Sequence, residues 1–277
     1  MKNKSLLAKF ASAPYTVWMC IFVIVPIALV VYYAFTDADG NFTFGNMTSI
    51  VEYGSTFLIS LKLALISTVI CLLMAYPVAY TISKMKQRRQ STMIMLVMLP
   101  MWMNFLIRTY AWMTILEGNG LINRFVRMLG GEGFSMINTD GAVVLGMVYN
   151  FLPYMILPIY TVLTKIEKST IEAAQDLGAN RLSVFRRVLL PMSIPGIISG
   201  ITMVFVPAVS TFVISKLLGG GKTFLIGDII ENFFLGNTGT VNYNVGAALS
   251  LVLMILILIS MTIMNHFDKD ESSGGIM

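Results

Sequence analysis

The sequence has 277 residues, of which 56% are hydrophobic and 12% are charged, and its formal net charge at pH 7 is +5. The charged share is about half of that in an average soluble domain, and a soluble globule could not bury so much apolar surface. The composition therefore excludes an ordinary soluble protein and predicts an all-α membrane protein.

Six stretches are long and apolar enough to cross the hydrocarbon core of a bilayer, which takes about 20 residues of helix. In chain order we expect spans at residues 15–35, 57–82, 91–116, 142–163, 193–215 and 245–264. Several contain proline, which membrane helices tolerate better than soluble helices do. The first stretch is too long for the apolar part of a signal peptide and lacks a small-x-small cleavage site, so we expect it to remain as a helix.

The distribution of basic residues indicates the orientation, because cytoplasmic segments of membrane proteins carry an excess of Lys and Arg. With both termini placed inside, thirteen of the 19 Lys and Arg residues fall on the inner side, the amino-terminal Lys2, Lys4 and Lys9 among them. Acidic residues show the opposite bias. We therefore expect both termini to be cytoplasmic, and we interpret the positive net charge as a topology signal and not as a nucleic-acid-binding surface.

No segment between the spans is long enough to fold separately, so residues 1–277 are expected to form a single transmembrane domain. The cysteines, Cys20 and Cys71, lie inside apolar runs and are expected to face lipid or the core. His266 is the one histidine and has no partners at metal-ligand spacing. We expect no catalytic, cofactor-binding or metal-binding residue in this chain.

The longest inner loop, residues 165–191, is punctuated like two short helices. The first is expected over residues 168–177, and Gly178 can take the positive φ that ends it. Asn180 is a suitable N-cap for the second helix, which Pro191 is expected to stop. The expected apolar faces are Ile171, Ala174 and Leu177, and then Leu182, Phe185 and Val188 or Leu189.

Periodicity alone leaves an alternative for this loop. The two helices could lie on the lipid headgroups, with Arg181, Arg186 and Arg187 at the phosphates.

A more specific pattern runs through the same loop. Glu172, Ala173 and Ala174 are followed four positions later by Gly178, and then by the run 188–191. This pattern resembles the EAA loop of ABC-importer permeases. The resemblance implies the type I ABC-importer permease fold, with a coupling helix that sits in a cleft of a cytoplasmic ATPase. The residues that it implies in ATPase coupling are Glu172, Ala173, Ala174, Asp176, Gly178, Phe185 and Pro191.

Further motifs lie outside the loop: residues 104–112 followed by 117–120, residues 149–160 with two prolines, and residues 212–220. Together they resemble the permease B subunits of spermidine/putrescine importers. The resemblance implies a multi-pass protein of the bacterial inner membrane and an importer of polyamines. Related permeases share the EAA loop, so a permease for thiamine, iron or molybdate is the alternative.

The same resemblance implies four kinds of partner besides lipid. These are a second homologous permease, two cytoplasmic ABC ATPase subunits, and an extracytoplasmic polyamine-binding protein. ATP and Mg²⁺ would bind the ATPase subunits, and this chain would hold no cofactor. The run Gly219–Thr223 looks like a phosphate-binding loop, but Lys216 stands where that motif needs its first glycine, so we expect only a flexible outer loop.

A pathway for a polyamine should offer carboxylates for the amines and aromatic faces for charge and methylenes alike. The candidates are Trp102, Asn104, Tyr110, Trp112, Glu117, Tyr149, Asn150, Asp228 and Glu231. The last two acids, three positions apart, would share one helical face. For Tyr110 and Trp112, the interfacial aromatic belt is a competing explanation. Arg108 is expected to snorkel or to pair with Glu117, and Gly196 and Gly200 to pack against another helix.

Two other function classes are less well supported by the sequence. A transporter driven by an ion gradient would place ionisable residues at mid-membrane, and the spans contain almost none. An integral membrane enzyme would need clustered His, Asp or Cys, and there is one histidine. We therefore expect a pore subunit that is not an enzyme.

Overall fold

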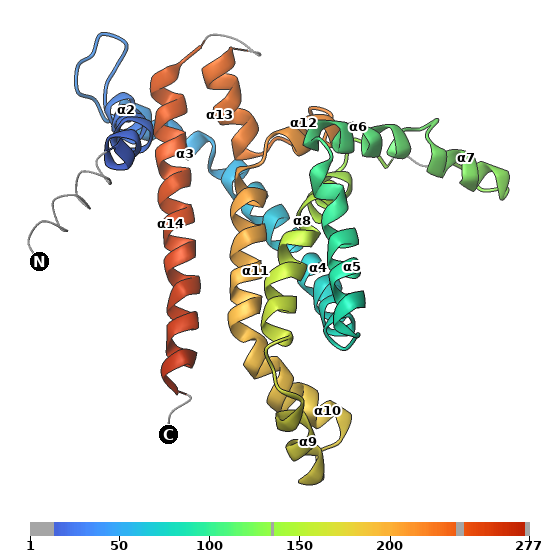
Figure 1. Cartoon of the computed structure of the whole chain (residues 1–277). Coiled ribbons are helices and arrows are strands. Elements are labelled where there is room, and N and C mark those ends of the chain that lie inside the picture. Colours follow the sequence, from blue (N-terminus) through green and yellow to red (C-terminus); the bar gives the residue numbers. More distant parts are fainter. Residues whose placement is uncertain (1–13, 134–135, 237–240, 275–277) are drawn as a thin grey trace, which may run out of the picture. The chain divides into compact units, whose positions relative to one another are not determined.

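The computed structural model describes residues 14–133, 136–236 and 241–274, with the side chains of residues 265–274 left aside (Figure 1). Lys2, Lys4 and Lys9 and the side chain of His266 lie outside this description. The described residues are mostly helical, with one isolated bridge between Thr36 and Phe42 in place of any strand. They divide into two compact units: unit 1 runs to Ser55 and includes Ile229–Leu256, and unit 2 contains Thr56–Asp228 and the chain beyond Ile257.

Unit 1 combines the amino-terminal part of the chain with the internal segment Ile229–Leu256. It contains the first span, Pro14–Ala34, whose last part is α2 (Val25–Ala34), and also α3 (Gly45–Glu52), most of α13 (Ile226–Leu235) and the first turns of α14 (Tyr243–Gly274). Its core joins Ala34 of α2 to Ala247, Ala248 and Leu251 of α14. Alanines at this contact let the two helix backbones approach closely.

Unit 2 holds most of the remaining helices. In chain order they are α4 (Gly54–Ser83), α5 (Gln87–Met98), η2 (Leu99–Trp102), α6 (Phe105–Leu116), α7 (Leu121–Met128), α8 (Asp140–Leu163), α9 (Lys168–Asp176), α10 (Arg181–Val184), η3 (Phe185–Leu189), α11 (Leu190–Ser210) and α12 (Val213–Leu218). The tightest packing is between α8 and α11. A Cβ on Gly196 would stand 2.9 Å from the carbonyl oxygen of Pro158, and one on Gly200 would stand 2.7 Å from the sulfur of Met155. The prediction that both glycines pack a helix is confirmed.

Five of the six expected spans are single helices of sufficient length and apolarity: Pro14–Ala34, Gly54–Ser83, Asp140–Leu163, Arg181–Ser210 and Tyr243–Met264. The two cysteines are free, with Cys20 exposed and Cys71 buried, as expected for lipid- and core-facing residues.

The third expected span is not one straight helix. Gln87–Trp102 and Phe105–Met128 meet at an angle of 87°. Pro100 lacks a backbone N–H and lies in the short 3₁₀ segment η2, after which Met103 is extended, with ψ 149°. Asn104 then starts α6 as its N-cap, because its side chain accepts the N–H groups of Leu106 and Ile107. The expectation of a continuous helix over residues 91–116 is therefore wrong.

Pro191 does not end the second helix of the inner loop, which corrects another expectation. The helix runs on from Arg181 to Ser210 as one element. The π turn η3 precedes the proline, and the N–H of Leu190 donates to the carbonyl oxygen of Phe185, five residues back. A proline ring clashes with the carbonyl four residues before it in an α-helix. The wider π turn provides the room that lets the helix continue.

Candidate coupling segment and substrate pathway

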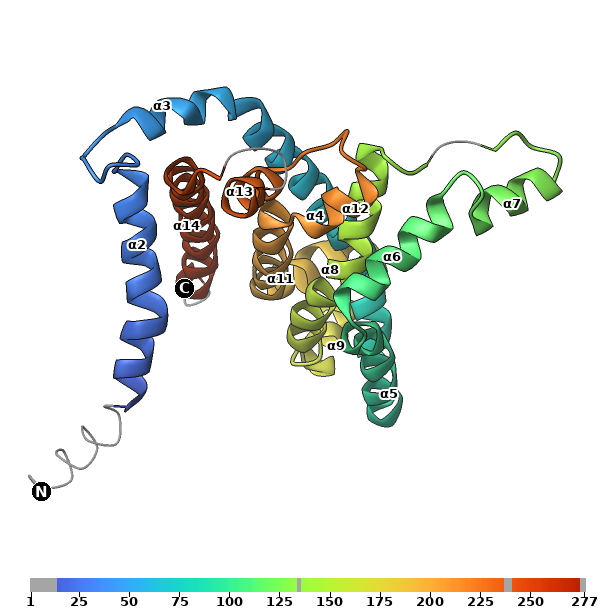
Figure 2. The ribbon, with the colours of Figure 1, turned by 90° about the horizontal axis from the view of Figure 1, so that it is seen from above.

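The coupling segment, which we define as residues 165–191, lies at one end of unit 2. Figure 1 shows α9 and α10 at this end, and α6, α7 and α12 at the opposite end. In the view from above, α8, α9 and α11 lie close together in projection (Figure 2). The sequence predicts a loop between two spans, and in the structure this loop forms the short helices α9, α10 and η3.

The turn inside the segment is built as expected. Gly178 has a φ of +83°, and its N–H donates to Gln175 while the N–H of Ala179 donates to Ala174. This pair of bonds is the Schellman arrangement, which ends α9 with a left-handed residue. The Asn180 side chain then accepts the N–H of Ser183 at 2.8 Å and starts α10. Both capping predictions are confirmed.

The outer surface of the segment is open. Glu172 and Ala173 are exposed, and Ala174 is half-buried. Leu177 is 89% exposed and Leu182 is 64% exposed, so the expected apolar face is only partly covered within the chain. An acid, a small residue and two uncovered leucines on one projection are suited to contact with another protein.

Phe185 lies on the inner side of the segment. It is half-buried, and its ring meets that of Tyr76 on α4 edge to face, at 5.5 Å between centroids. The Tyr76 hydroxyl is in turn 3.0 Å from the hydroxyl of Ser193 on α11. These contacts join the coupling segment to α4 and to the first turn of α11. Sequence analysis missed Tyr76 and Ser193, because 117 positions separate them and no spacing motif links them.

A second link fixes the neighbouring helix ends. The hydroxyl of Tyr160, near the end of α8, donates to the side-chain oxygen of Gln90 at 3.0 Å. The side-chain nitrogen of Gln90 donates to the carbonyl oxygens of Ser83 and Met85, between α4 and α5. The end of α8 that leads into the coupling segment is thereby tied to the α4–α5 turn.

The aromatic pathway candidates fall into two groups. Trp102 is 74% exposed and Tyr110 is 50% exposed. Trp112 instead packs on Tyr149 of α8, with 5.3 Å between ring centroids and 68° between planes. The structure therefore brings Trp112 and Tyr149 together and leaves Trp102 and Tyr110 facing outward from the chain.

The polar candidates are mostly occupied by local bonds. Asn104 caps α6, and the buried Asn150 donates to the carbonyl oxygen of Gly146 at 2.9 Å. Asp228 is buried, and one of its oxygens accepts the N–H of Leu225 at 2.8 Å. Glu231 lies three positions further along α13, as expected, and is half-buried. Glu117 is exposed at the end of α6.

The expectation for Arg108 is wrong in both its forms. The side chain is 7% exposed, so it does not snorkel, and it forms no ion pair with Glu117. Its guanidinium lies 6.0 Å from the ring of Phe105, and its Nε and Nη1 atoms have no hydrogen-bond partner among the described residues. The side chain is on the buried face of α6, together with Thr109 and Leu116, so helix geometry directs it inward.

The glycine run of residues 219–223 follows helix α12 and not a strand, which agrees with its exclusion as a phosphate-binding loop. It is also more tightly held than expected. The Thr223 hydroxyl donates to the Asp140 carboxylate at 2.6 Å, and the N–H of Asn138 donates to the carbonyl oxygen of Leu218 at 2.8 Å. The run is therefore fastened to the start of α8.

Sequence relatives of this chain are transport permeases. The family model described as the binding-protein-dependent transport system inner membrane component matches residues 1–272. The chain is 38% identical over 249 residues to the spermidine/putrescine transport system permease protein PotB of Haemophilus influenzae, covering 86% of each chain. It is 35% identical over 249 residues to the PotB protein of Escherichia coli strain K12, covering 86% of this chain and 90% of the relative.

Solved structures show the same fold at low sequence identity. The chain matches a subunit of a bacterial alginate ABC transporter, solved with an alginate pentasaccharide-bound periplasmic protein, with a TM-score of 0.78 and 17% identity, over 97% and 96% of the two chains. It matches the MetNI methionine ABC transporter with a TM-score of 0.56 and 18% identity, over 78% and 94%. The expected ABC-importer permease fold is confirmed, while the cytoplasmic orientation of the termini stays a prediction.

Proposed function

Because this chain belongs to the family of binding-protein-dependent transport system inner membrane components, we propose that it is the membrane-spanning permease subunit of an ATP-driven importer of polyamines. The chain is thus a multi-pass transport protein of the bacterial inner membrane and not an enzyme. The observation that carries the polyamine assignment is the similarity to two PotB permeases at 35% and 38% identity over most of both chains.

The proposed assembly supplies what this chain lacks. Permeases of this family depend on a binding protein, and the alginate and methionine neighbours are parts of ABC transporters. We propose that this chain pairs with a second homologous permease, two cytoplasmic ATPase subunits and an outer polyamine-binding protein. ATP and Mg²⁺ would bind the ATPase subunits, and this chain contributes half of the translocation path.

The coupling segment is where we expect the ATPase to dock. The exposed carboxylate of Glu172 would pair with a basic side chain of the ATPase, and Ala173 allows close backbone approach. Leu177 and Leu182 would be covered by the same partner. When ATP binding closes the ATPases, the segment moves with them and shifts the two permeases from inward- to outward-facing access.

The contacts behind the segment support this transmission. Phe185 touches Tyr76 on α4, and Tyr76 bonds Ser193 on α11, so a displacement of α10 reaches two spans directly. A docking surface without such contacts would move without displacing the spans. We propose that hydrolysis then returns the permeases to the inward-facing state.

The substrate is tested by competition in proteoliposomes that contain the full complex. Uptake of labelled spermidine should require ATP and the binding protein, and excess unlabelled spermidine or putrescine should suppress it. Thiamine, ferric iron and molybdate at the same concentration should leave uptake unchanged. Failure of excess spermidine to compete would overturn the polyamine assignment and leave the family assignment intact.

The docking role is tested with Glu172→Lys. Reversing this exposed charge should reduce uptake at least tenfold, because like charges across an interface cost several kcal/mol. The complex should still insert into the membrane, since Glu172 makes no contact in the core. Glu132→Lys, which reverses an exposed acid outside the coupling segment, is the control. Equal uptake by wild type and Glu172→Lys would remove the docking role from this residue.

A further inference from the structure

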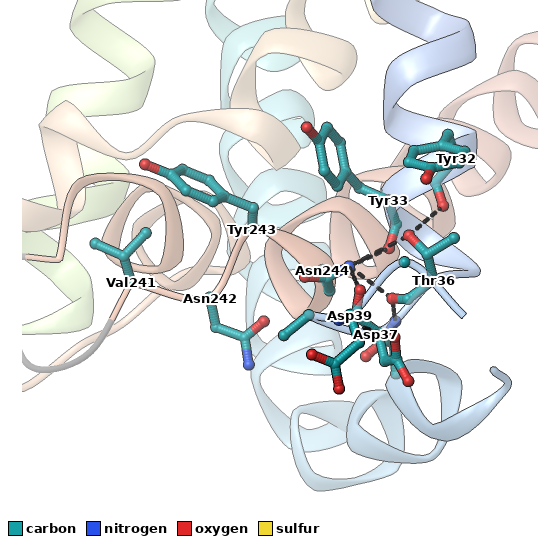
Figure 3. Close-up of a pocket in the computed structure, with 12 residues that line it drawn as sticks. Tyr32, Tyr33, Thr36, Asp37, Asp39, Val241, Asn242, Tyr243 and Asn244 are labelled. Atoms are coloured by element: carbon teal, nitrogen blue, oxygen red, sulfur yellow. Dashed lines mark hydrogen bonds between the residues drawn. The ribbon is translucent and has the colours of Figure 1, made fainter. Parts of the chain in front are cut away.

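Unit 1 contains a pocket of about 670 Å³ that no step of the proposed transport cycle uses. It is formed where α2 ends, by the loop that follows, and by the residues that lead into α14 (Figure 3). Its volume is within the usual range of small-molecule sites, roughly 300–1,000 Å³. Its lining residues are Tyr32, Tyr33, Thr36, Asp37, Ala38, Asp39, Gly40, Asn46, Val241, Asn242, Tyr243 and Asn244.

The frame of the pocket is held by amide side chains. Asn244 donates to the carbonyl oxygens of Thr36 at 2.6 Å and Tyr33 at 3.2 Å, so the start of α14 is bonded to the end of α2. Asn46 donates to the same Thr36 oxygen at 2.8 Å from another side. Three elements are thereby fixed around one backbone position, and the pocket exists before any ligand arrives.

The loop that carries the carboxylates is also preformed. One oxygen of Asp37 accepts the N–H groups of Asp39 at 3.0 Å and Asn41 at 2.8 Å. These bonds curl the loop and leave the second Asp37 oxygen and the exposed Asp39 carboxylate available to a ligand. In Figure 3 both carboxylates lie on the same side of the pocket, below the rings of Tyr33 and Tyr243.

The charged residues of unit 1 favour a cationic ligand over an anionic one. Its described residues include Asp37, Asp39, Glu52 and Glu231, and they include no Lys, Arg or His. No positive group is therefore available within the described part of the unit to neutralise the pocket, and an anion would be repelled.

The aromatic lining distinguishes an organic cation from a metal ion. Tyr32, Tyr33 and Tyr243 present ring surfaces, on which ammonium groups and methylene chains both bind favourably. A divalent metal would instead need several converging oxygens at one point, and rings cannot provide them.

We propose that this pocket is an accessory binding site for a linear polyamine on the outer face of the permease. The two carboxylates bind ammonium groups and the tyrosines cover the methylene spacers. The site rests on the proposed function for its ligand class and on the expected orientation for its outward placement. It would raise the local concentration of substrate at the permease, and it shares no residue with the aromatic candidates of unit 2.

The site is tested by thiol protection on the assembled complex in a Cys20→Ala background. Ala38→Cys places a reactive thiol in the pocket without changing its charge, and Val51→Cys places one on the exposed face of α3 outside it. Spermidine should slow labelling of Ala38→Cys by a membrane-impermeant maleimide and leave labelling of Val51→Cys unchanged. The binding protein is omitted, so that protection reports on this chain.

Charge variants identify the groups responsible. Adding Asp37→Asn and Asp39→Asn should raise the spermidine concentration for half-protection by about two- to fivefold per carboxylate, as expected for exposed ion pairs. Asn keeps the oxygen that accepts the two loop N–H groups, so the loop is preserved; Asp39→Asn alone serves if the double variant fails to assemble. Glu52→Gln removes an equal charge from unit 1 outside the pocket and should have no effect.

Three results would overturn the proposal: no protection by spermidine, equal protection by Mg²⁺ or Ca²⁺, or protection only when the binding protein is added back in a separate assay. The first result would mean that spermidine does not bind the pocket, the second that the pocket binds metal ions, and the third that it is a contact surface for the binding protein. Uptake by wild-type complex is measured in parallel. Protection without spermidine uptake would refute the proposed function alone, and uptake without protection would refute only the pocket.

Discussion

At Gly196, α11 lies close to the backbone of α8. The nearest atom to an added Cβ is the backbone oxygen of Pro158, at 2.9 Å, which cannot move aside as a flexible side chain can. Gly196→Ala should therefore lower the stability of the complex by about 1–3 kcal/mol, the usual cost of overpacking. Gly200→Ala should cost less, since the sulfur of Met155, which lies closest, is on a flexible side chain. The midpoint of thermal unfolding in detergent measures both.

Gly54→Ala is the control for this pair, because an added Cβ there meets nothing within 4 Å. If Gly196→Ala and Gly54→Ala melted at the same temperature, α8 and α11 would not pack as closely as the structure shows.

The two tryptophans of the third span region should behave differently on truncation. Trp112 packs on Tyr149, so Trp112→Ala should lower the unfolding midpoint, and the lost ring pair alone contributes about 0.5–1.5 kcal/mol. Trp102 is 74% exposed, so Trp102→Ala should leave the midpoint unchanged and weaken spermidine uptake. Uptake kinetics and thermal unfolding of both variants test the distinction. Normal uptake by Trp102→Ala would remove it from the pathway.

Among the elements, α10 and η3 connect the coupling segment to the spans through one aromatic contact. Phe185→Ala should lower the amount of spermidine imported per ATP hydrolysed, because η3 would no longer contact the ring of Tyr76 on α4. Tyr76→Phe keeps the ring and loses only the bond to Ser193, about 1 kcal/mol, so its effect should be smaller. Leu73→Ala, exposed on the same helix α4, is the control. An unchanged import ratio for Phe185→Ala would contradict this route.

Several elements could be predicted from the sequence, and the reasons are physical. Apolar length identifies a span without knowledge of its neighbours, and Gly178 and Asn180 have cap preferences that depend only on local backbone geometry. Pro100 and Pro191 could not be interpreted in the same way. A proline in an apolar run can kink, break or be absorbed by a π turn, and the surrounding packing determines which occurs.

The candidate pathway was less predictable for a similar reason. Residue type suggested Asn104, Asn150 and Asp228, yet all three side chains make hydrogen bonds to backbone groups within four residues of their own position. The pocket of unit 1 was not foreseen at all. Its walls come from segments about 200 positions apart in the sequence, and only folding brings Asp37 beside Asn244.

For the whole molecule, orientation is the prediction on which docking and substrate capture both depend. In a Cys20→Ala background and in vesicles prepared without the ATPase subunits, Leu177→Cys should react with an impermeant maleimide only in inside-out vesicles, and Val51→Cys only in right-side-out vesicles. Both positions are more than 80% exposed, so access depends on sidedness alone. Labelling of Leu177→Cys from outside would invert the topology and place the coupling segment away from ATP.

The right-angled corner between α5 and α6 limits what can surround the assembled protein. At about 1.5 Å per residue, Gln87–Trp102 is about 24 Å long, shorter than the roughly 30 Å hydrocarbon layer. Gln87–Trp102 alone is therefore too short to cross this layer, and a chain that enters it along α5 turns inside it. The Asn104 side chain accepts two backbone N–H groups at this corner. The last carbonyl groups of a helix lack intrahelical partners, and acyl chains offer them no hydrogen-bond donor. This corner, with Trp102 beside it, must be shielded from lipid by neighbouring protein or by water.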